Sequence, residues 1–290
     1  MALGDLNGDV RDPPDAELKG TTVSVVIPAK DEAHNLWQVL PQLARDDYEV
    51  ILVDGNSTDD TIAMAQRLHP KIIVIGQTRR GKGNALACGF AVAQGDFIVT
   101  LDADGSADPA EIPRFVDALE KGADLAKGSR FLPGGGSNDI SRVRRTGNSL
   151  LNRIFNLLYG TKYTDLCYGY NAFRRQCLSV IDLDWRNADG VDGATMLWGD
   201  GFEVETLINV RIAQAGLQVS EVPSFERRRG CGVSNLNAVS DGLRILRTIH
   251  AERRRASRLA VETPAVSQAI AGTSRFQRPA APSSGPPMPI

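Results

Sequence analysis

Two aspartates separated by one residue follow directly after an apolar stretch. Asp102-Ala103-Asp104 comes after Phe97–Leu101, which has the length and composition of a buried strand. In extended backbone, residues i and i+2 point to the same side, so both carboxylates can face one cation. Carboxylate oxygens suit Mg²⁺ or Mn²⁺, with waters and substrate phosphates completing the coordination. We therefore expect Asp102 and Asp104 to hold a divalent metal. The competing interpretation is a solvated turn before a helix that Asp108 caps.

Three further polar clusters also follow strand-sized apolar segments. One of them has the G-x-x-x-x-G-K spacing of a P-loop, but Gly83 stands where that motif needs Ser or Thr. This glycine-rich, basic segment still leads into a helix and can contact a nucleotide there. In another cluster, Asp54 stands at a strand tip, where its carboxylate can accept hydrogen bonds from a base or ribose. The clusters are Lys30–Glu32, Asp54–Ser57 and Arg79–Gly83.

Strand-like and helix-like segments alternate through the first 120 residues. Continuous apolar strands that alternate with helices predict a parallel sheet covered on both faces. Ligands of such sheets bind beyond the carboxyl ends of the strands, so all four polar clusters should converge on one crevice. The expected strands are Val23–Ile27, Val50–Val53, Lys71–Ile75 and Phe97–Leu101, and the expected helices are Asn35–Ala44, Asp60–Leu68, Asn84–Ala93 and Glu111–Leu119.

Composition narrows the class of protein. The 290 residues include 33 Lys+Arg and 35 Asp+Glu, a net charge of −2 that argues against a dedicated nucleic-acid binder. No apolar run approaches the roughly 18–20 residues of a membrane-spanning helix, and the N-terminus lacks the apolar core of a secretory signal. The four cysteines form no C-x-x-C pair, which favours reduced thiols in a cytoplasmic protein over a zinc site.

The chain divides into one domain with two polar ends. Residues 1–20 are predicted to be a mobile arm, and the Pro/Ala/Ser-rich residues 259–290 a disordered tail. Residues 21–258 remain for one domain. Within it, the glycine-rich segment Phe131–Ser141 is expected to be either a flexible lid or a structureless surface loop.

Taken in order, the motifs resemble those of inverting family-two glycosyltransferases with the GT-A fold. The resemblance is strongest to the branch containing the dolichol-phosphate mannosyltransferases and polyprenol-phosphate glycosyltransferases. It implies one α/β domain, with a single Rossmann-like, mostly parallel sheet, helices on both faces and an acceptor-side C-terminal part. The matching segments are Val25–Glu32, Val53–Thr61, Gly81–Ala85, Leu101–Asp104, Gly128–Phe131, Asp165–Phe173, Glu205, Glu221–Phe225 and Arg229–Leu236.

The resemblance also implies roles for individual residues. A nucleotide sugar would bind beside Asp102 and Asp104, which would hold the metal on its diphosphate. Arginines of this family meet donor or acceptor phosphates, and the matching positions are Arg130, Arg145 and Arg229. Asp165 and Glu205 are further candidates for the catalytic centre. The residues expected to line the nucleotide site are Pro28, Ala29, Glu32, Asp54, Lys82, Gly83, Asp102 and Ala103.

The implied reaction is a metal-dependent, inverting transfer of a sugar from GDP-mannose or a UDP-hexose to a polyprenyl phosphate. Such a phosphate is largely dianionic at pH 7 and needs little help from a base. A saccharide or natural-product hydroxyl is the alternative acceptor, and Asn235, where the family usually carries lysine, favours it. A hydroxyl would need a carboxylate base, for which the candidates are Asp165, Asp200, Glu203 and Glu205. A sugar nucleotidyltransferase and a non-catalytic nucleotide- or metal-binding module are the minor alternatives.

Residues 226–258 are strongly basic. They carry nine arginines against three acidic residues, a local charge of +6, and Leu243 and Leu246 recur at helical spacing. One interpretation is an amphipathic helix that lies on anionic lipid at the inner face of the membrane. The other is a helix docked on the domain with a solvated basic face.

Overall fold

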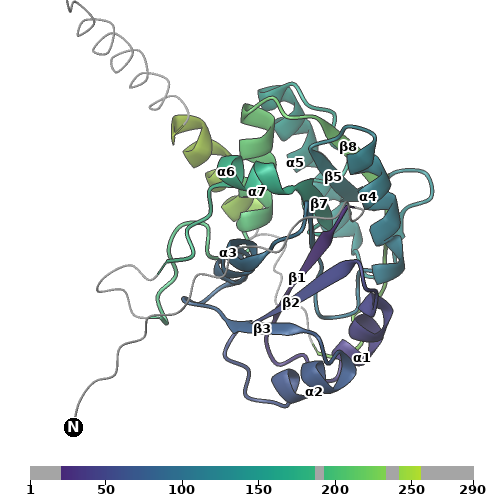
Figure 1. The fold of residues 1–290 in the computed structure, drawn as a ribbon. Helices are drawn as coiled ribbons and strands as arrows, with labels where there is room; N and C mark the ends of the chain where they lie inside the picture. Colours follow the sequence, from purple (N-terminus) through teal and green to yellow (C-terminus); the bar gives the residue numbers. More distant parts are fainter. Residues whose placement is uncertain (1–20, 187–192, 233–241, 256–290) are drawn as a thin grey trace, which may run out of the picture.

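A seven-stranded sheet forms the centre of the molecule (Figure 1). The computed structural model describes residues 21–186, 193–232 and 242–255, so the expected arm 1–20, the tail 259–290 and Asn235 lie outside the described residues. The strand order is β3-β2-β1-β4-β7-β5-β8. The strands are β1 (Val23–Ala29), β2 (Tyr48–Asp54), β3 (Ile73–Gly76), β4 (Phe97–Thr100), β5 (Leu125–Ser129), β7 (Asn171–Arg174) and β8 (Val219–Pro223).

Helices cover both faces of this sheet, as expected from the alternating segments. The chain continues beyond these helices into a helical segment formed by residues 242–255. The other helices are α1 (Leu36–Val39), η1 (Leu40–Leu43), α2 (Thr61–Leu68), α3 (Lys82–Val92), η2 (Pro109–Glu111), α4 (Ile112–Glu120), α5 (Arg142–Tyr159), η3 (Arg175–Cys177), α6 (Leu178–Ile181) and α7 (Val204–Gln214).

The core follows from the period-two alternation of the strands. Val25 and Leu52 face a cluster with α1, η1, α2 and α4, whereas Val26 and Ile51 face a cluster with α3, α6 and α7. Each fully buried aliphatic side chain of this kind contributes about 1.5–3 kcal/mol to folding. A third cluster joins Phe155 of α5, residues of α7 and Ile249, and so fixes α5 and the segment 242–255 beside α7.

One central strand runs against the others. β7 pairs antiparallel with both of its neighbours, β4 and β5, while all other pairs in this sheet are parallel. The mostly parallel α/β sheet is therefore confirmed. Because β7 is reversed, it begins at the edge where β4 ends, and the Thr100 hydroxyl donates to the Gly169 carbonyl at 2.9 Å. The loop before β7 is thereby brought to the carboxyl edge of the sheet.

The glycine-rich segment 131–141 is not structureless, and its action as a lid stays a prediction. It contains β6 (Gly136–Ser137), which pairs in parallel with β9 (Phe225–Glu226), and the Ser137 hydroxyl donates to the Glu226 carboxylate. The segment is therefore anchored, and its glycines allow turns such as Gly134, which has a φ of +90°.

Across the three described ranges, no helix combines the length and the apolar character that crossing a bilayer requires.

Candidate active site

One cavity of about 1570 Å³ lies at the carboxyl edge of the sheet. All four polar clusters singled out in the sequence border it, because parallel strands end at the same edge. The residues that they contribute to its wall are Lys30–Glu32, Gly55, Asn56, Arg80–Lys82 and Asp102–Asp104.

Asp102 is paired with an internal cation. The Lys82 Nζ lies 2.7 Å from an Asp102 carboxylate oxygen and 2.6 Å from an oxygen of Glu205. Lys82 begins α3, and Glu205 lies in the first turn of α7, so two helix starts meet at this point. Burial alone disfavours the ammonium, but both carboxylates outweigh it and hold the pKa of Lys82 well above its usual value.

Asp104 is paired in the same manner. The Arg229 Nε lies 3.4 Å from an Asp104 oxygen, and its Nη2 lies 2.5 Å from an oxygen of Glu32. Burial raises the pKa of the Glu32 carboxyl, and the hydrogen bond from Asn35 and the charge of Arg229 offset this only in part. Backbone contacts support the arrangement, since the Gly230 amide donates to the Asp104 carbonyl at 3.2 Å and the Cys231 amide donates to Asn35 at 2.8 Å.

Asp102 and Asp104 fit as ligands of a divalent ion whose remaining coordination positions a substrate would fill. Asp102 and Asp104 both border the cavity, and their side chains are 39% and 19% exposed. Both already lie beside cations, so the position attracts positive charge. Within the described part of the chain, no group of three or more His, Cys, Asp or Glu residues could hold a metal. Two carboxylates with phosphate oxygens and waters match what Mg²⁺ prefers.

The expected nucleotide-site residues divide into two groups. Pro28, Ala29, Glu32, Lys82 and Ala103 border the cavity. Two others, Asp54 and Gly83, are not among the residues that border it. Because neither expectation is tested by a bound nucleotide, both stay predictions.

Asp54 and Gly83 each have a clear local role. Asp54 is buried and accepts from the Ser57 amide at 3.2 Å, which shapes the turn that carries Gly55 and Asn56 to the wall. The Gly83 amide donates to the Asp200 carbonyl at 2.7 Å. A Cβ on Gly83 would lie 1.8 Å from the Gly199 carbonyl oxygen, so only glycine fits this approach.

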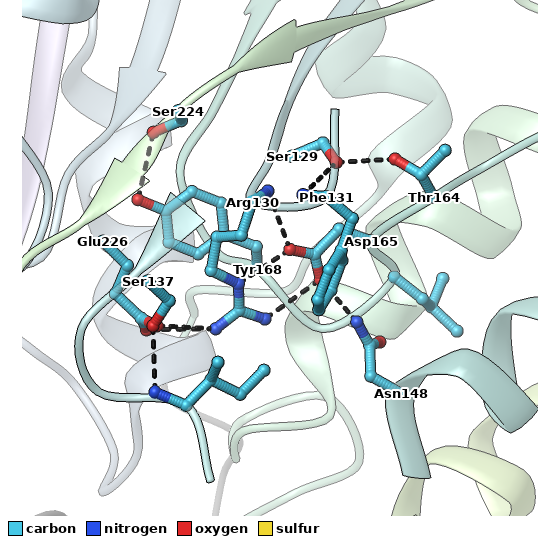
Figure 2. A network of polar contacts seen from close by, with 12 residues as sticks. Ser129, Arg130, Phe131, Ser137, Asn148, Thr164, Asp165, Tyr168, Ser224 and Glu226 are labelled. Carbon is cyan, nitrogen blue, oxygen red and sulfur yellow. Dashed lines mark hydrogen bonds and ion pairs between the residues drawn. The ribbon is translucent and has the colours of Figure 1, made fainter. Parts of the chain in front are cut away.

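Arg130 lies in a buried network rather than in open solvent (Figure 2). Its Nε and Nη2 donate to Asp165 at 2.7 and 3.0 Å, and its Nη1 donates to Glu226 at 3.0 Å. Its guanidinium also lies over the Tyr168 ring, 4.7 Å from the centroid. Asp165 is fully buried and accepts a further hydrogen bond from Asn148 of α5 at 2.8 Å. In this structure the network joins β5, α5 and β9, and a role of Arg130 or Asp165 in the reaction stays a prediction.

Asp200 and Glu203, the remaining candidates for a general base, also accept hydrogen bonds within the protein. Asp200 accepts from the Nε of buried Arg79 at 2.8 Å and from the Leu197 amide at 2.7 Å. Glu203 accepts from the amides of Gly199 and Gly201 at 3.1 and 3.2 Å. Both carboxylates therefore order the segment that precedes α7.

Apolar side chains also border the cavity, and those of α5 were not anticipated from the sequence. Val143 and Leu150 of α5 and Leu243 and Leu246 of the segment 242–255 border it, together with Arg144 and Arg244. The signal in the sequence is the spacing of Val143, Leu150 and Leu157, which lie seven residues apart on α5. This spacing puts them on one helix face, whereas Leu151 and Phe155 occupy the buried face. Arg145, the neighbouring position singled out earlier, is exposed, and its guanidinium lies 5.7 Å from the Phe131 ring centroid.

The four cysteines form no disulfide in the structure, and their reduced state stays a prediction. Cys167 borders the cavity, but burial raises the pKa of its thiol to about 12. It is therefore protonated at neutral pH and is a poor nucleophile.

Comparison with known proteins places these features in context. The profile described as Glycosyl transferase family 2 matches residues 24–181. A polyprenol monophosphomannose synthase from Mycolicibacterium smegmatis is 33% identical over 223 residues, which cover 73% of this chain and 80% of that protein. An undecaprenyl-phosphate mannosyltransferase from Micrococcus luteus is 33% identical over 227 residues, which cover 74% of this chain and 87% of that protein.

A solved structure supports the fold. Glucosyl-3-phosphoglycerate synthase from Mycobacterium tuberculosis, in complex with Mn²⁺, uridine diphosphate and glucosyl-3-phosphoglycerate, aligns with a TM-score of 0.58. The two chains are 23% identical, and the alignment covers 80% of each. This likeness, together with the strand order, confirms the GT-A arrangement expected from the motifs.

Proposed function

Because the chain belongs to glycosyltransferase family 2, we propose that it transfers a sugar from a nucleotide sugar to a polyprenyl phosphate, with inversion at the anomeric carbon and with the aid of Mg²⁺ or Mn²⁺. The two relatives named for polyprenol and undecaprenyl phosphates support this acceptor, and their names also favour mannose as the sugar. GDP-mannose is therefore the first donor to test, ahead of UDP-hexoses. Family membership argues against the nucleotidyltransferase and the non-catalytic module.

The observation that carries this proposal is the mixed lining of one cavity. Asp102 and Asp104 border it, and their carboxylates suit a metal ion that offers a sugar diphosphate its counter-charge. Leu150, Leu243 and Leu246 border the same cavity, as does Arg144. A polyprenyl phosphate has the same two-part character, because its phosphate needs cationic partners and its chain needs apolar ones.

The interactions of the four carboxylates that could act as a general base also favour a phosphate acceptor. Asp165, Asp200 and Glu205 all form ion pairs with basic side chains, and Glu203 accepts from two backbone amides. A hydroxyl acceptor requires a carboxylate that is available to take its proton. A phosphate dianion reacts without this help, because its second pKa is about 6.

In the proposed reaction, a phosphate oxygen of the acceptor attacks the anomeric carbon. The bond from that carbon to the diphosphate breaks, and the nucleoside diphosphate leaves with the electron pair. Asp102 and Asp104 would hold the metal, which would neutralise charge on the leaving diphosphate. Lys82 and Arg229 would bind diphosphate oxygens from either side, while Pro28, Ala29 and Glu32 would form the wall beside the nucleoside.

We expect GDP-mannose, in the presence of Mn²⁺, to give release of nucleoside diphosphate that a short-chain polyprenyl phosphate stimulates. The test is a panel of GDP-mannose, UDP-glucose and UDP-N-acetylglucosamine, each with Mn²⁺ or EDTA and with or without the lipid phosphate. The product is identified by mass spectrometry. Release that simple saccharides stimulate, and the lipid phosphate does not, would instead establish the soluble-acceptor alternative.

An exposed apolar stripe on α5 supports a location at the membrane surface, where such an acceptor resides. Val143, Leu150 and Leu157 are 69%, 59% and 86% exposed. Arginines on α5 and on the adjoining segment 242–255 accompany the stripe, which suits an anionic lipid surface. We propose that this face contacts the headgroup region and places the apolar residues that border the cavity against the bilayer. The arginines are Arg142, Arg145, Arg153, Arg247 and Arg253–Arg255.

Leu157→Glu tests this contact. Burying one leucine in the lipid is worth about 1.5–3 kcal/mol, so we expect the variant to bind phosphatidylglycerol vesicles about tenfold more weakly in a sedimentation assay. Leu157 does not border the cavity, so release of nucleoside diphosphate with a water-soluble acceptor analogue should persist. Ile62→Glu on α2 is the matched control, because Ile62 is also exposed but lies on another face. Equal binding by both variants and the wild type would exclude α5 as the membrane contact.

A further inference from the structure

Each carboxylate of the expected metal motif, Asp102 and Asp104, contacts a basic side chain of the protein itself. Lys82 bridges Asp102 and Glu205, and Arg229 contacts both Asp104 and Glu32. Each cation thus contacts one carboxylate of the motif and one carboxylate outside it. The two bridges come from different parts of the chain, the start of α3 and the segment after β9, and they meet at the same cavity.

We propose that Lys82 and Arg229 couple metal binding to donor binding. Each cation pairs with its motif aspartate and so competes with a divalent ion for that carboxylate. When metal and donor bind together, each cation exchanges its motif aspartate for a diphosphate oxygen. This inference rests on the proposed nucleotide-sugar donor and adds the order and cooperativity with which the site is filled.

The second carboxylate of each bridge makes this exchange feasible. A cation that lost its sole partner in a partly buried site would be left with an unfavourable unpaired charge. Glu205 lies 2.6 Å from Lys82, and Glu32 lies 2.5 Å from Arg229, so each cation would keep one partner while the other is exchanged. Lys82 and Arg229 are 14% and 26% exposed, so they are held in place yet reach the cavity.

Charge counting gives the direction of the coupling. The four carboxylates and two cations sum to −2, and a divalent ion brings this to zero. Without the metal, a diphosphate would enter a site that is already negative. Without the diphosphate, the metal competes with Lys82 and Arg229 for Asp102 and Asp104. Each ligand therefore removes the obstacle to the other, which makes their binding free energies cooperative.

The experiment measures Mn²⁺ binding directly, by the loss of the electron paramagnetic resonance signal of free Mn²⁺, with and without GDP or UDP. We expect the wild type to bind one of the two nucleoside diphosphates. In its presence, the affinity for Mn²⁺ should rise at least about tenfold. In Lys82→Met, Mn²⁺ should bind about tenfold more tightly without nucleotide, and the tightening by nucleotide should shrink at least about fivefold. Arg229→Met is expected to behave in the same direction and provides an independent variant.

Lys30→Met is the matched control. Lys30 borders the same cavity but forms no ion pair with any residue of the described ranges, so its removal changes the charge without touching the bridges. If Lys82→Met, Arg229→Met and Lys30→Met all shift Mn²⁺ binding equally, a general charge effect operates and the inference is wrong. Unchanged coupling in both bridge variants would also overturn it. If Mn²⁺ binds neither to the wild type nor to any variant in the presence of GDP or UDP, the proposed metal-dependent function fails together with the inference.

Discussion

Replacing Asp102 with asparagine is expected to lower the rate of sugar transfer about 10³-fold, because the metal loses a carboxylate that carries its charge. The estimate corresponds to about 4 kcal/mol of transition-state stabilisation, the range in which a metal acts on a leaving diphosphate. Asp104→Asn is expected to behave alike. The measurement is release of nucleoside diphosphate at saturating donor and Mn²⁺, together with urea unfolding of each variant.

The fold should tolerate both substitutions. Asp102 is 39% exposed at its side chain, and Lys82 retains Glu205 as a partner after the exchange. Asp117→Asn is the matched control, because Asp117 lies on α4 in an exposed pair with Lys121 and should keep full activity. Removing the metal from the wild type with EDTA should lower its rate of sugar transfer as much as the substitution does. Added Mn²⁺ should restore the rate of the wild type but not that of the variants. An Asp102→Asn enzyme that retains more than about a tenth of the wild-type rate would show that this carboxylate does not support the metal.

Much of the sheet could be predicted from the sequence because the strands β1, β2 and β4 are buried on both faces. Val50–Val53 is a continuous apolar run, Val23–Ile27 is apolar except for the buried Ser24, and both appear as interior parallel strands. The carboxyl-edge rule then brings the polar clusters together without knowledge of any side-chain contact. β7 could not be found in this manner, since its four residues, Asn171–Arg174, show neither a long apolar run nor alternation. Its pairing is specified by the tertiary structure.

The chemistry of single side chains was less predictable than their location. The sequence placed Asp102, Asp104, Lys82 and Glu205 at one site, and the structure brings them to the cavity wall. It did not indicate which carboxylate pairs with which cation, because Lys82 and Glu205 are 123 residues apart. The apolar contribution of α5 to the cavity wall was missed for a related reason. A sequence pattern does not show which face of a helix the rest of the protein covers, and here Val143 and Leu150 are exposed while Phe155 is buried.

Arginines in this protein illustrate how a motif position can be structural. Arg79 belongs to a glycine-rich basic loop, yet it is 2% exposed and pairs with Asp200. Arg130 follows a motif strand, yet its guanidinium is taken by Asp165 and Glu226. Both arginines tie distant segments to the carboxyl edge of the sheet. They hold the loops that form the cavity wall, which lets more exposed cations such as Lys82 and Arg229 face ligands.

Arg130→Met is expected to destabilise the protein by about 3–5 kcal/mol, because it leaves buried carboxylates without their cation. Asp165 is fully buried, and Glu226 is 8% exposed. Both would then pay for desolvation with no compensating charge. Tyr168 would also lose the guanidinium that lies over its ring. The free energy of unfolding in urea, measured for variant and wild type under identical conditions, gives the size of the effect.

The functional consequence follows from what the Arg130 network joins. Asn148 connects Asp165 to α5, and Ser137 connects Glu226 to β6, so loss of Arg130 should loosen the attachment of both α5 and β6, and α5 contributes to the cavity wall. Arg45→Met provides the control, because the Arg45–Asp47 pair is about half exposed and should contribute no more than about 1 kcal/mol. An Arg130→Met protein that unfolds like the wild type, but has a raised KM for the lipid phosphate, would contradict the structural role. Arg130 would then be a residue that binds acceptor phosphate, and Asp165 and Glu226 would serve to orient it.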